Sequence, residues 1–261
     1  MRGVKERELQ MNKGVWRQIQ DALFPRTCLL CRGRLDGHET VSRLICNGCL
    51  GDFECNHRAC RHCAEPMAQA EFVSGTLLCG RCQKKPPAFH QVLAPYLYRY
   101  PVSELIQRFK GQDQMLLNRL LSDLLSDYLM GQLNSDMIKR PDIILPVPTH
   151  WRTRLKRGFN PAACLADAVG RQLAIPVNMS ALRKQVMTRP QHDLNREQRL
   201  KNLDQSFALR NQAEIRGREV ALVDDVVTTG STADVIASLL RDNGAASVQV
   251  WAFARTPNQR R

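Results

Sequence analysis

Four pairs of cysteines with the spacing of metal ligands lie between residues 28 and 82. They are Cys28 with Cys31, Cys46 with Cys49, Cys60 with Cys63, and Cys79 with Cys82. A C-x-x-C turn brings two thiolates to one side of a tight loop, and a second such turn completes a tetrahedral zinc site. Four protein ligands leave no open position for water or substrate. The sequence therefore predicts two structural Zn2+ ions held by these eight cysteines.

The four C-x-x-C turns can be combined into two zinc sites in two ways. The block that begins at Cys28 recurs about 32 residues later, at Cys60, as a short internal repeat. This repeat favours two sequential ribbons, each with its own ion, over a cross-braced arrangement in which alternate pairs share a metal. The residues leave open whether the ribbons are structural only or also hold nucleic acid or a protein partner.

A second set of chemically suggestive residues follows the apolar run Glu219–Val223. Two carboxylates, Asp224 and Asp225, come first, and a turn of small polar residues then leads into a predicted helix. The turn contains Thr228, Thr229, Gly230, Ser231 and Thr232. The N-terminus of a helix offers unpaired N–H groups and the positive end of a dipole, so this turn is suited to hold a phosphate.

The two aspartates need a different partner, because carboxylates repel a phosphate. The diol of a ribose donates two hydrogen bonds and would satisfy them, with Mg2+ nearby. Hydrogen bonds to charged groups are worth about 1.5–3 kcal/mol each, so sugar recognition would depend on both acids. The motif G-x-x-x-x-G-K-[ST] of P-loop proteins does not occur in the chain.

A basic stretch follows the short apolar strand predicted over Asp142–Val147. It contains Arg152, Arg154, Lys156 and Arg157, followed by Gly158. Ligands of α/β proteins bind at the carboxyl ends of parallel strands, and a basic loop there would suit a leaving pyrophosphate. The alternatives are a solvated loop or one that touches a nucleic-acid backbone.

The elements that would position these residues read as an α/β domain. Helices are predicted over residues 102–110, 114–130 and 232–243, and another begins at Pro161 with Asn160 as its cap. Cys164 on that helix is predicted to lie in the core. Strands are predicted over 142–147, 219–223 and 247–253. Strand–helix–strand with short connections implies a parallel sheet flanked by helices.

Composition sets the class of protein. Hydrophobic residues make up 43% and charged residues 24% of the 261, which is ordinary globular usage. No apolar stretch reaches the length of a membrane span, and residues 1–20 lack the apolar core of a secretory signal. We therefore expect no membrane insertion and a cytoplasmic location. The net charge of +13 raises encounter rates with any polyanion without choosing among DNA, RNA and phosphorylated metabolites.

The run from Val223 to Thr232 is similar to the signature of the type I phosphoribosyltransferases. Together with the C-x-x-C ribbons, Pro146-Val147-Pro148 and Arg157-Gly158-Phe159-Asn160, it resembles the ComF family, including its GntX-like DNA-utilisation proteins. The likeness covers residues 23–255. It implies a type I phosphoribosyltransferase-like sheet preceded by a Cys-rich double zinc ribbon. The implied boundaries are a tail and lead-in helix over 1–25, the double zinc ribbon over 26–85, and the phosphoribosyltransferase-like domain over 90–261.

The resemblance also implies ligands and partners. These are phosphoribosyl pyrophosphate with Mg2+, incoming single-stranded DNA and a DNA-uptake helicase, in natural transformation. The family's flexible loop corresponds to Lys184–Asn202, whose Arg199 and Lys201 are candidates for a closing lid. Three roles remain open: a phosphoribosyltransferase (pentosyl transfer) of nucleotide metabolism with an unidentified acceptor, a binding module in DNA uptake, and a sensor of phosphoribosyl pyrophosphate.

Overall fold

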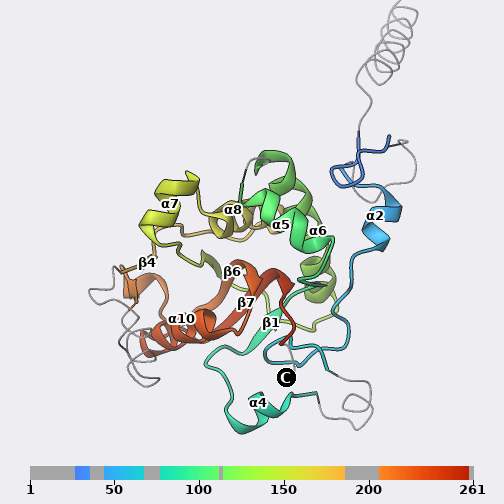
Figure 1. The fold of residues 1–261 in the computed structure, drawn as a ribbon. Coiled ribbons are helices and arrows are strands. Elements are labelled where there is room, and N and C mark those ends of the chain that lie inside the picture. Colours follow the sequence, from blue (N-terminus) through green and yellow to red (C-terminus); the bar gives the residue numbers. More distant parts are fainter. Residues whose placement is uncertain (1–26, 36–43, 68–76, 112–113, 186–205, 259–261) are drawn as a thin grey trace, which may run out of the picture. The chain divides into compact units, whose positions relative to one another are not determined.

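The computed structural model of the chain describes residues 27–35, 44–67, 77–111, 114–185 and 206–258. The chain divides into two compact units, Met1–Asp52 and Phe53–Arg261 (Figure 1). The lead-in helix predicted within residues 1–25 lies outside the described residues. Among the helices that the structure describes, none is long and apolar enough to cross a membrane.

The first unit contains a zinc-ribbon-like fold around four cysteines. An antiparallel bridge joins Thr27 to Arg34 and closes the turn that carries Cys28 and Cys31. The short helix α2 (Asn47–Gly51) begins directly after Cys46, whose sulfur accepts a hydrogen bond from the N–H of Cys49 at 3.4 Å. The cysteine sulfur therefore caps the helix that carries the fourth ligand.

The second unit begins with a ribbon of the same design. A bridge joins Ala59 to Pro66, which are the positions 32 residues beyond Thr27 and Arg34. Helix α4 (Gly80–Lys84) begins directly after Cys79, as α2 begins after Cys46. The structure confirms the predicted repeat and groups the cysteines sequentially rather than in a cross-braced manner.

A parallel sheet with strand order β1-β7-β6-β3 forms the centre of the second unit. Its strands are β1 (Gln91–Leu93), β2 (Tyr96–Leu97, also paired with β7), β3 (Ile143–Pro146), β6 (Glu219–Val227) and β7 (Ser247–Arg255). The long apolar runs of β6 and β7 are buried on both faces, as is typical of parallel sheets. Strand β6 continues four residues past its predicted end because Asp224, Val226 and Val227 still pair with β7.

Helices cover both faces of this sheet (Figure 1). Helices α5 (Val102–Phe109), α6 (Gln114–Asn134) and α8 (Pro161–Leu173) lie on one side, where α8 packs against β3 and β6. Helix α10 (Ser231–Asp242) lies on the other side against β7. The predicted α/β architecture, a parallel sheet flanked by helices, is confirmed.

The second ribbon shares the core on the α10 side of the sheet. Cys60, Cys63 and Phe89 belong to the same buried cluster as Val220 and Leu222 of β6 and as Ile236 and Leu240 of α10. Because side chains alternate along a strand, Asp224 continues the row of Val220 and Leu222, while Asp225 belongs to the opposite row. The acidic pair is thus divided between the two faces of β6.

The connection from β3 to β6 contains two further features. Residues 151–157, predicted as a loop, form the helix α7 (Trp151–Arg157). Strands β4 (Leu182–Lys184) and β5 (Phe207–Leu209) pair antiparallel, and the 3-10 turn η2 (Gln212–Glu214) follows them. The predicted cap of α8 is confirmed, since Asn160 accepts a hydrogen bond from the N–H of Ala162 at 3.2 Å.

Candidate functional site

Each group of four cysteines has the geometry of a zinc site. Within each group the four sulfurs lie within 4.8 Å of one another. The sulfurs of Cys31 and Cys46 are 3.8 Å apart, and those of Cys63 and Cys79 are 3.6 Å apart. Zn–S bonds of about 2.3 Å in a tetrahedron place sulfurs about 3.8 Å apart. Both groups therefore fit one Zn2+ each, with all four positions filled by protein.

One thiol in each group is poised to ionise. A hydrogen bond from the Cys60 thiol lowers the pKa of Cys63 to about 4, and the same bond raises the pKa of Cys60. Burial alone would raise the pKa of Cys28, but backbone N–H groups that donate to its sulfur lower it to about 6. Thiolates are the form that binds zinc, so these sulfurs favour metal capture.

Arg255 connects the second ribbon to the turn after β6. Its side chain is fully buried at the end of β7. The guanidinium donates to the carbonyl oxygen of Cys63 at 2.9 Å and to that of Thr228, and it forms an ion pair with Glu65 at 2.6 Å. Glu65 also accepts hydrogen bonds from the backbone and side chain of Asn258. A single buried cation thus connects a cysteine turn with the first residue of the predicted phosphate loop.

The chain after α4 makes a second connection to the same turn. The N–H of Ala88 donates to Asp234 of α10 at 2.6 Å, and Arg241 donates to the Ala88 carbonyl oxygen at 3.2 Å. Phe89 lies under Gly230, close enough that a β-carbon there would meet its ring at 3.7 Å. The segment that leaves the second ribbon therefore packs against the predicted phosphate loop and the start of α10.

The predicted phosphate loop, Thr228–Thr232, has the conformation that its sequence indicates. Gly230 adopts φ +80° and is the N-cap residue of α10. This left-handed conformation favours glycine. The hydroxyls of Thr229 and Ser231 lie 2.9 Å apart, and the side chains of the loop's other residues are exposed. Hydroxyls and the N-terminus of a twelve-residue helix converge here, which is an arrangement suited to an anion.

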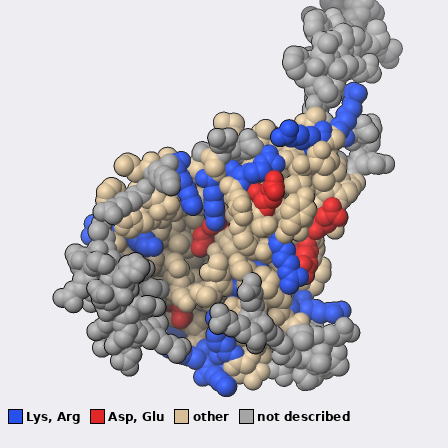
Figure 2. All heavy atoms as spheres, in the orientation of Figure 1, with Lys and Arg blue, Asp and Glu red and all other residues tan. Residues whose placement is uncertain are grey.

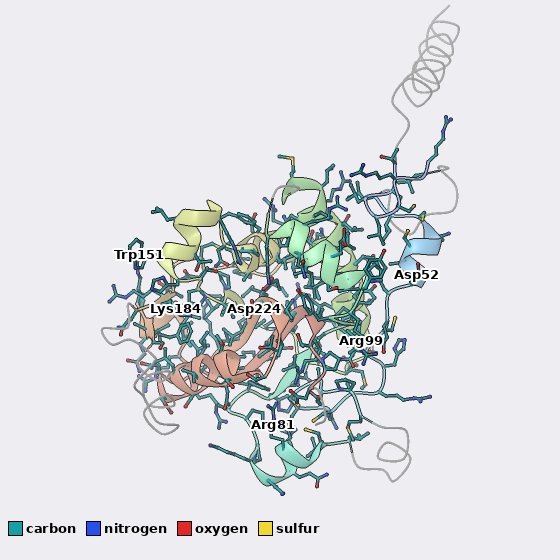
Figure 3. All side chains as sticks on the ribbon, in the orientation of Figure 1. Asp52, Arg81, Arg99, Trp151, Lys184 and Asp224 are labelled. Atoms are coloured by element: carbon teal, nitrogen blue, oxygen red, sulfur yellow. The ribbon has the colours of Figure 1, made fainter. Side chains whose placement is uncertain are left out.

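The acidic pair lies on β6 just before this loop (Asp224 is labelled in Figure 3). The N–H of Asp225 donates to the carboxylate of Asp224 at 2.9 Å. Burial, and then repulsion from Asp225, raise the pKa of Asp224 well above its ordinary value. Asp225 is only 8% exposed and forms an ion pair with Lys110, which follows α5.

Lys110 is a site residue that the sequence did not single out. It supplies a positive charge to the acid that faces away from α10, so the structure already holds a counterion where two carboxylates would otherwise repel each other. Arg255 and Glu65 were also missed. The available signals were a basic residue at the end of a predicted helix and a lone arginine that ends an apolar strand.

The segment after β3 lies beside the acidic pair. Pro146, the last residue of β3, is in register with Val223 of β6, and the N–H of Val147, the first residue after β3, donates to the Val223 carbonyl oxygen at 2.8 Å. Asn160 closes the segment into a loop, because its side chain donates to the Val147 carbonyl oxygen at 3.0 Å and accepts from the Thr149 hydroxyl at 2.7 Å. The structure thus brings residues 146–149, which precede the predicted pyrophosphate residues, beside the predicted ribose acids at one edge of the sheet.

The basic residues of that segment are only partly described. Arg157 is exposed at the end of α7, and Gly158 follows it with φ +80°. The side chains of Arg152, Arg154 and Lys156 lie outside the described part of the chain, as do Arg199 and Lys201 of the predicted lid. Their assignment to pyrophosphate therefore stays a prediction.

Two family models match the chain. The model described as "Double zinc ribbon domain" matches residues 19–85, and the one described as "Phosphoribosyl transferase domain" matches residues 125–261. Both matches agree with the cysteine groups and with the parallel sheet described above.

Curated relatives match nearly the whole chain. "Competence protein F" of Haemophilus influenzae is 36% identical over 234 residues, which cover 89% of this chain and 98% of that protein. "DNA utilization protein YhgH" of Escherichia coli is 35% identical, with the same coverage. "Competence protein ComFC" of Streptococcus pneumoniae is 23% identical and covers 87% of this chain and 99% of that protein.

Solved structures match over about half of the chain. Purine phosphoribosyltransferase from Pyrococcus horikoshii covers 52% of this chain and 83% of its own, with 19% identity and a TM-score of 0.30. Glutamine phosphoribosylpyrophosphate amidotransferase from Bacillus subtilis covers 52% of this chain and 25% of its own, with 19% identity and a TM-score of 0.36.

Proposed function

The chain belongs to the competence protein F (ComF) family, and from this premise we propose that it binds phosphoribosyl pyrophosphate with Mg2+ and acts in DNA uptake and utilisation. The observation that carries the ligand is the meeting of three elements at one edge of the sheet. They are the acidic pair on β6, the loop that caps α10, and the segment that follows β3.

Each element has a distinct role in this proposal. Asp224 and Asp225 accept hydrogen bonds from the ribose hydroxyls, and the Thr228–Thr232 loop donates to the 5′-phosphate. The pyrophosphate is assigned to Arg152, Arg154, Arg157 and Gly158. Mg2+ prefers carboxylate and phosphate oxygens, so the acidic pair is a suitable place for it, and when bound it offsets part of the pyrophosphate charge.

Replacement of Asp225 tests the ligand. We expect Asp225→Ala to weaken binding of phosphoribosyl pyrophosphate roughly tenfold or more, because about 1.5–3 kcal/mol of charged hydrogen bonding is lost. Calorimetry with and without Mg2+ measures this. Asp242→Ala, an exposed aspartate at the end of α10, is the matched control and should bind as the wild type does. Equal affinity of both variants would refute the assignment of Asp225.

A phosphoribosyltransferase with an unidentified acceptor is the second candidate. One feature favours it: the antiparallel pair β4–β5 flanks the segment that contains the predicted lid. A transfer reaction must exclude water from the sugar, and a lid has that purpose. We expect Arg199→Ala to reduce pyrophosphate release against candidate acceptors more than it reduces ligand binding. If no acceptor yields pyrophosphate, the protein is a binding module or a sensor.

The role in DNA utilisation extends the proposal to a macromolecule. The relatives' names concern competence and DNA utilization, and the chain carries a net charge of +13. Figure 2 shows Lys and Arg side chains at several places on the face in view rather than in one patch. We propose contact with single-stranded DNA, while a helicase partner and the cytoplasmic location stay predictions.

A further inference from the structure

A cavity of about 690 Å3 lies beside the candidate phosphoribosyl site, and most of its lining residues have no role in that site. Its lining includes Pro146 at the end of β3, Thr149, and Gly158, which the proposed function assigns to the pyrophosphate, but neither aspartate of the acidic pair and no residue of the Thr228–Thr232 loop. Figure 3 shows the labelled residues Trp151 and Lys184, both of which line it, to one side of Asp224. The cavity therefore adjoins the pyrophosphate end of that site and extends beyond it, which leaves room for a further ligand.

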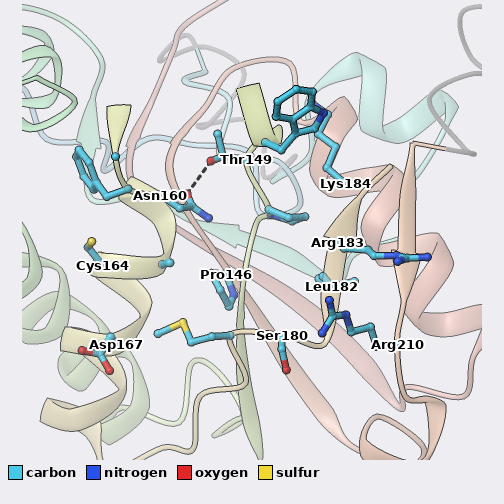
Figure 4. Close-up of a pocket in the computed structure, with 16 residues that line it drawn as sticks. Pro146, Thr149, Asn160, Cys164, Asp167, Ser180, Leu182, Arg183, Lys184 and Arg210 are labelled. Carbon is cyan, nitrogen blue, oxygen red and sulfur yellow. Dashed lines mark hydrogen bonds between the residues drawn. The ribbon is translucent and has the colours of Figure 1, made fainter. Parts of the chain in front are cut away.

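One wall of the cavity is basic. Figure 4 shows Arg183 and Arg210 together on the side of the cavity opposite Cys164 and Asp167. Arg183 pairs in register with Ala208 of β5, and Arg210 directly follows β5, two residues beyond Ala208, so both arginines lie on the same side of the chain here. Both arginines are exposed, and neither forms an ion pair with another residue in the part of the chain that the structure describes.

The opposite wall does not cancel this charge. Asp167 forms an ion pair with Arg171 at 2.7 Å, one turn further along α8, so its negative charge already has a partner. Cys164, which the sequence placed in the core, is half-buried and lines the cavity instead, because α8 turns this side away from the sheet. The wall formed by Arg183 and Arg210 therefore presents uncompensated positive charge.

The mouth of the cavity adds exposed apolar surface. Trp151 is 48% exposed and Met179 is 46% exposed, and both line the cavity. Lys184 lies over the ring of Phe207, with its ammonium 5.5 Å from the ring centre. Exposed aromatic surface next to unpaired cations is the combination by which proteins hold single-stranded nucleic acid, with bases stacked on rings and phosphates on cations.

We infer that this cavity binds single-stranded DNA, with a phosphate held by Arg183 and Arg210 and a base stacked on Trp151. The inference rests on the proposed function, because it gives a site to the proposed contact with DNA. Single strands fit this geometry and duplexes do not, since a base inside a duplex is stacked between its neighbours and has no free face for an indole.

The charge part is tested by salt titration. Binding of a fluorescently labelled thymidine oligonucleotide to the full chain is followed by anisotropy over a range of salt concentrations. Each phosphate contact on single strands contributes about −0.7 to the log–log slope, so the double variant Arg183→Gln/Arg210→Gln should lower its magnitude by about 1.4. Arg216→Gln, an exposed arginine that does not line the cavity, should leave the slope unchanged.

The stacking part is tested on α7. Trp151→Ala should weaken binding at fixed salt by roughly 5- to 150-fold, the effect of losing one stacked base, while the slope is retained. Trp151→Phe should restore most of the affinity. Leu155→Ala is the matched control, because Leu155 is 80% exposed on the same helix and does not line the cavity.

The outcomes separate this inference from the phosphoribosyl proposal. Calorimetry with phosphoribosyl pyrophosphate should give wild-type affinity for the cavity variants, and loss of that affinity would merge the cavity with the phosphoribosyl site and overturn the inference. It is also overturned if the wild type does not bind the oligonucleotide, if cavity and control variants bind it alike, or if thymidine monophosphate binds as tightly as the oligonucleotide. If the oligonucleotide results are as expected but phosphoribosyl pyrophosphate does not bind, the proposed ligand is refuted and the inference about DNA stands.

Discussion

The two cysteine ribbons have the same local design and different surroundings. Each has a bridge across its first turn and a short helix that begins after its third cysteine. In the first ribbon Cys31 is exposed and Cys46 half-exposed, and the ribbon belongs to a unit of its own. In the second, three of four cysteines are buried in the core of the sheet, and the Cys63 carbonyl accepts a hydrogen bond from Arg255. The repeated cysteine motif therefore determines how the four sulfurs are arranged, but it does not determine which parts of the chain pack against the ribbon.

The two structural zinc ions are therefore expected to have different roles: one folds only its own ribbon, and the other folds a ribbon that also packs against the sheet. A short segment with few apolar residues cannot bury much surface, so zinc supplies most of the free energy that folds the first ribbon. The second ribbon has the same need, but it also contributes buried surface to the sheet and supports the loop that precedes α10. We expect the two zinc sites to differ in how far the effect of their loss extends.

The largest expected effect comes from replacing one ligand in each ribbon. Cys60→Ser should remove one zinc ion and lower the stability of the whole second unit by several kcal/mol, because the metal's binding free energy is also folding free energy. Cys28→Ser should also remove one ion but change the main unfolding transition by less than about 0.5 kcal/mol. Metal analysis and urea unfolding measure both. Equal shifts of the main transition in the two variants would refute the difference between the ribbons.

A smaller effect is expected from the buried ion pair that joins the second ribbon to β7. Arg255→Met removes the cation from Glu65, whose side chain is only 14% exposed, and the loss of one partner of a buried pair costs about 3–5 kcal/mol. Arg99→Met is the matched control, since Arg99 and Glu54 form a similarly short pair whose side chains are 56% and 46% exposed. Exposed pairs contribute about 0–1 kcal/mol.

Chemical denaturation of the two arginine variants gives the comparison directly. If Arg255→Met were no more destabilising than Arg99→Met, the ion pair between Arg255 and Glu65 would not contribute to the stability of the second unit. Binding of phosphoribosyl pyrophosphate provides a second measurement, because Arg255 donates to the Thr228 carbonyl oxygen at the start of the predicted phosphate loop, whereas Arg99 pairs with Glu54.

Local signals predicted much of the fold and of the candidate site. The cysteine spacing, the cap at Asn160 and the run around Gly230 each act within a few residues, and the structure confirms their geometry. The contacts that were missed join distant parts of the chain: Arg255 and Cys63 are 192 positions apart. One sequence contains no signal for such a pair. The prediction that Cys164 lies in the core was also wrong. Helical periodicity shows which side chains share a face of α8, but it does not show whether a cavity lies next to that face.

The smallest expected effect concerns Asp224, whose pKa is raised in the folded chain. Below the ordinary value of 3.8 the carboxyl is protonated in both states and affects stability little. As the pH rises past that value, the unfolded chain releases the proton while the folded chain retains it, so stability falls until the pH passes the raised pKa. Asp224→Asn is neutral throughout. It should therefore unfold at a higher temperature than the wild type at pH 7, and the gain should vanish near pH 4.

Scans of melting temperature between pH 4 and 8 test this, with about 2–4 °C expected for each kcal/mol released. Asp242→Asn, at the exposed end of α10, is the control and should show no such divergence with pH. The same Asp224→Asn variant should bind phosphoribosyl pyrophosphate more weakly, because an amide accepts hydrogen bonds from a diol less strongly than a carboxylate does. A gain in stability with a loss of affinity would identify Asp224 as a residue kept for its ligand at a cost to the fold. Loss of stability at neutral pH would instead assign Asp224 a structural role like that of Arg255.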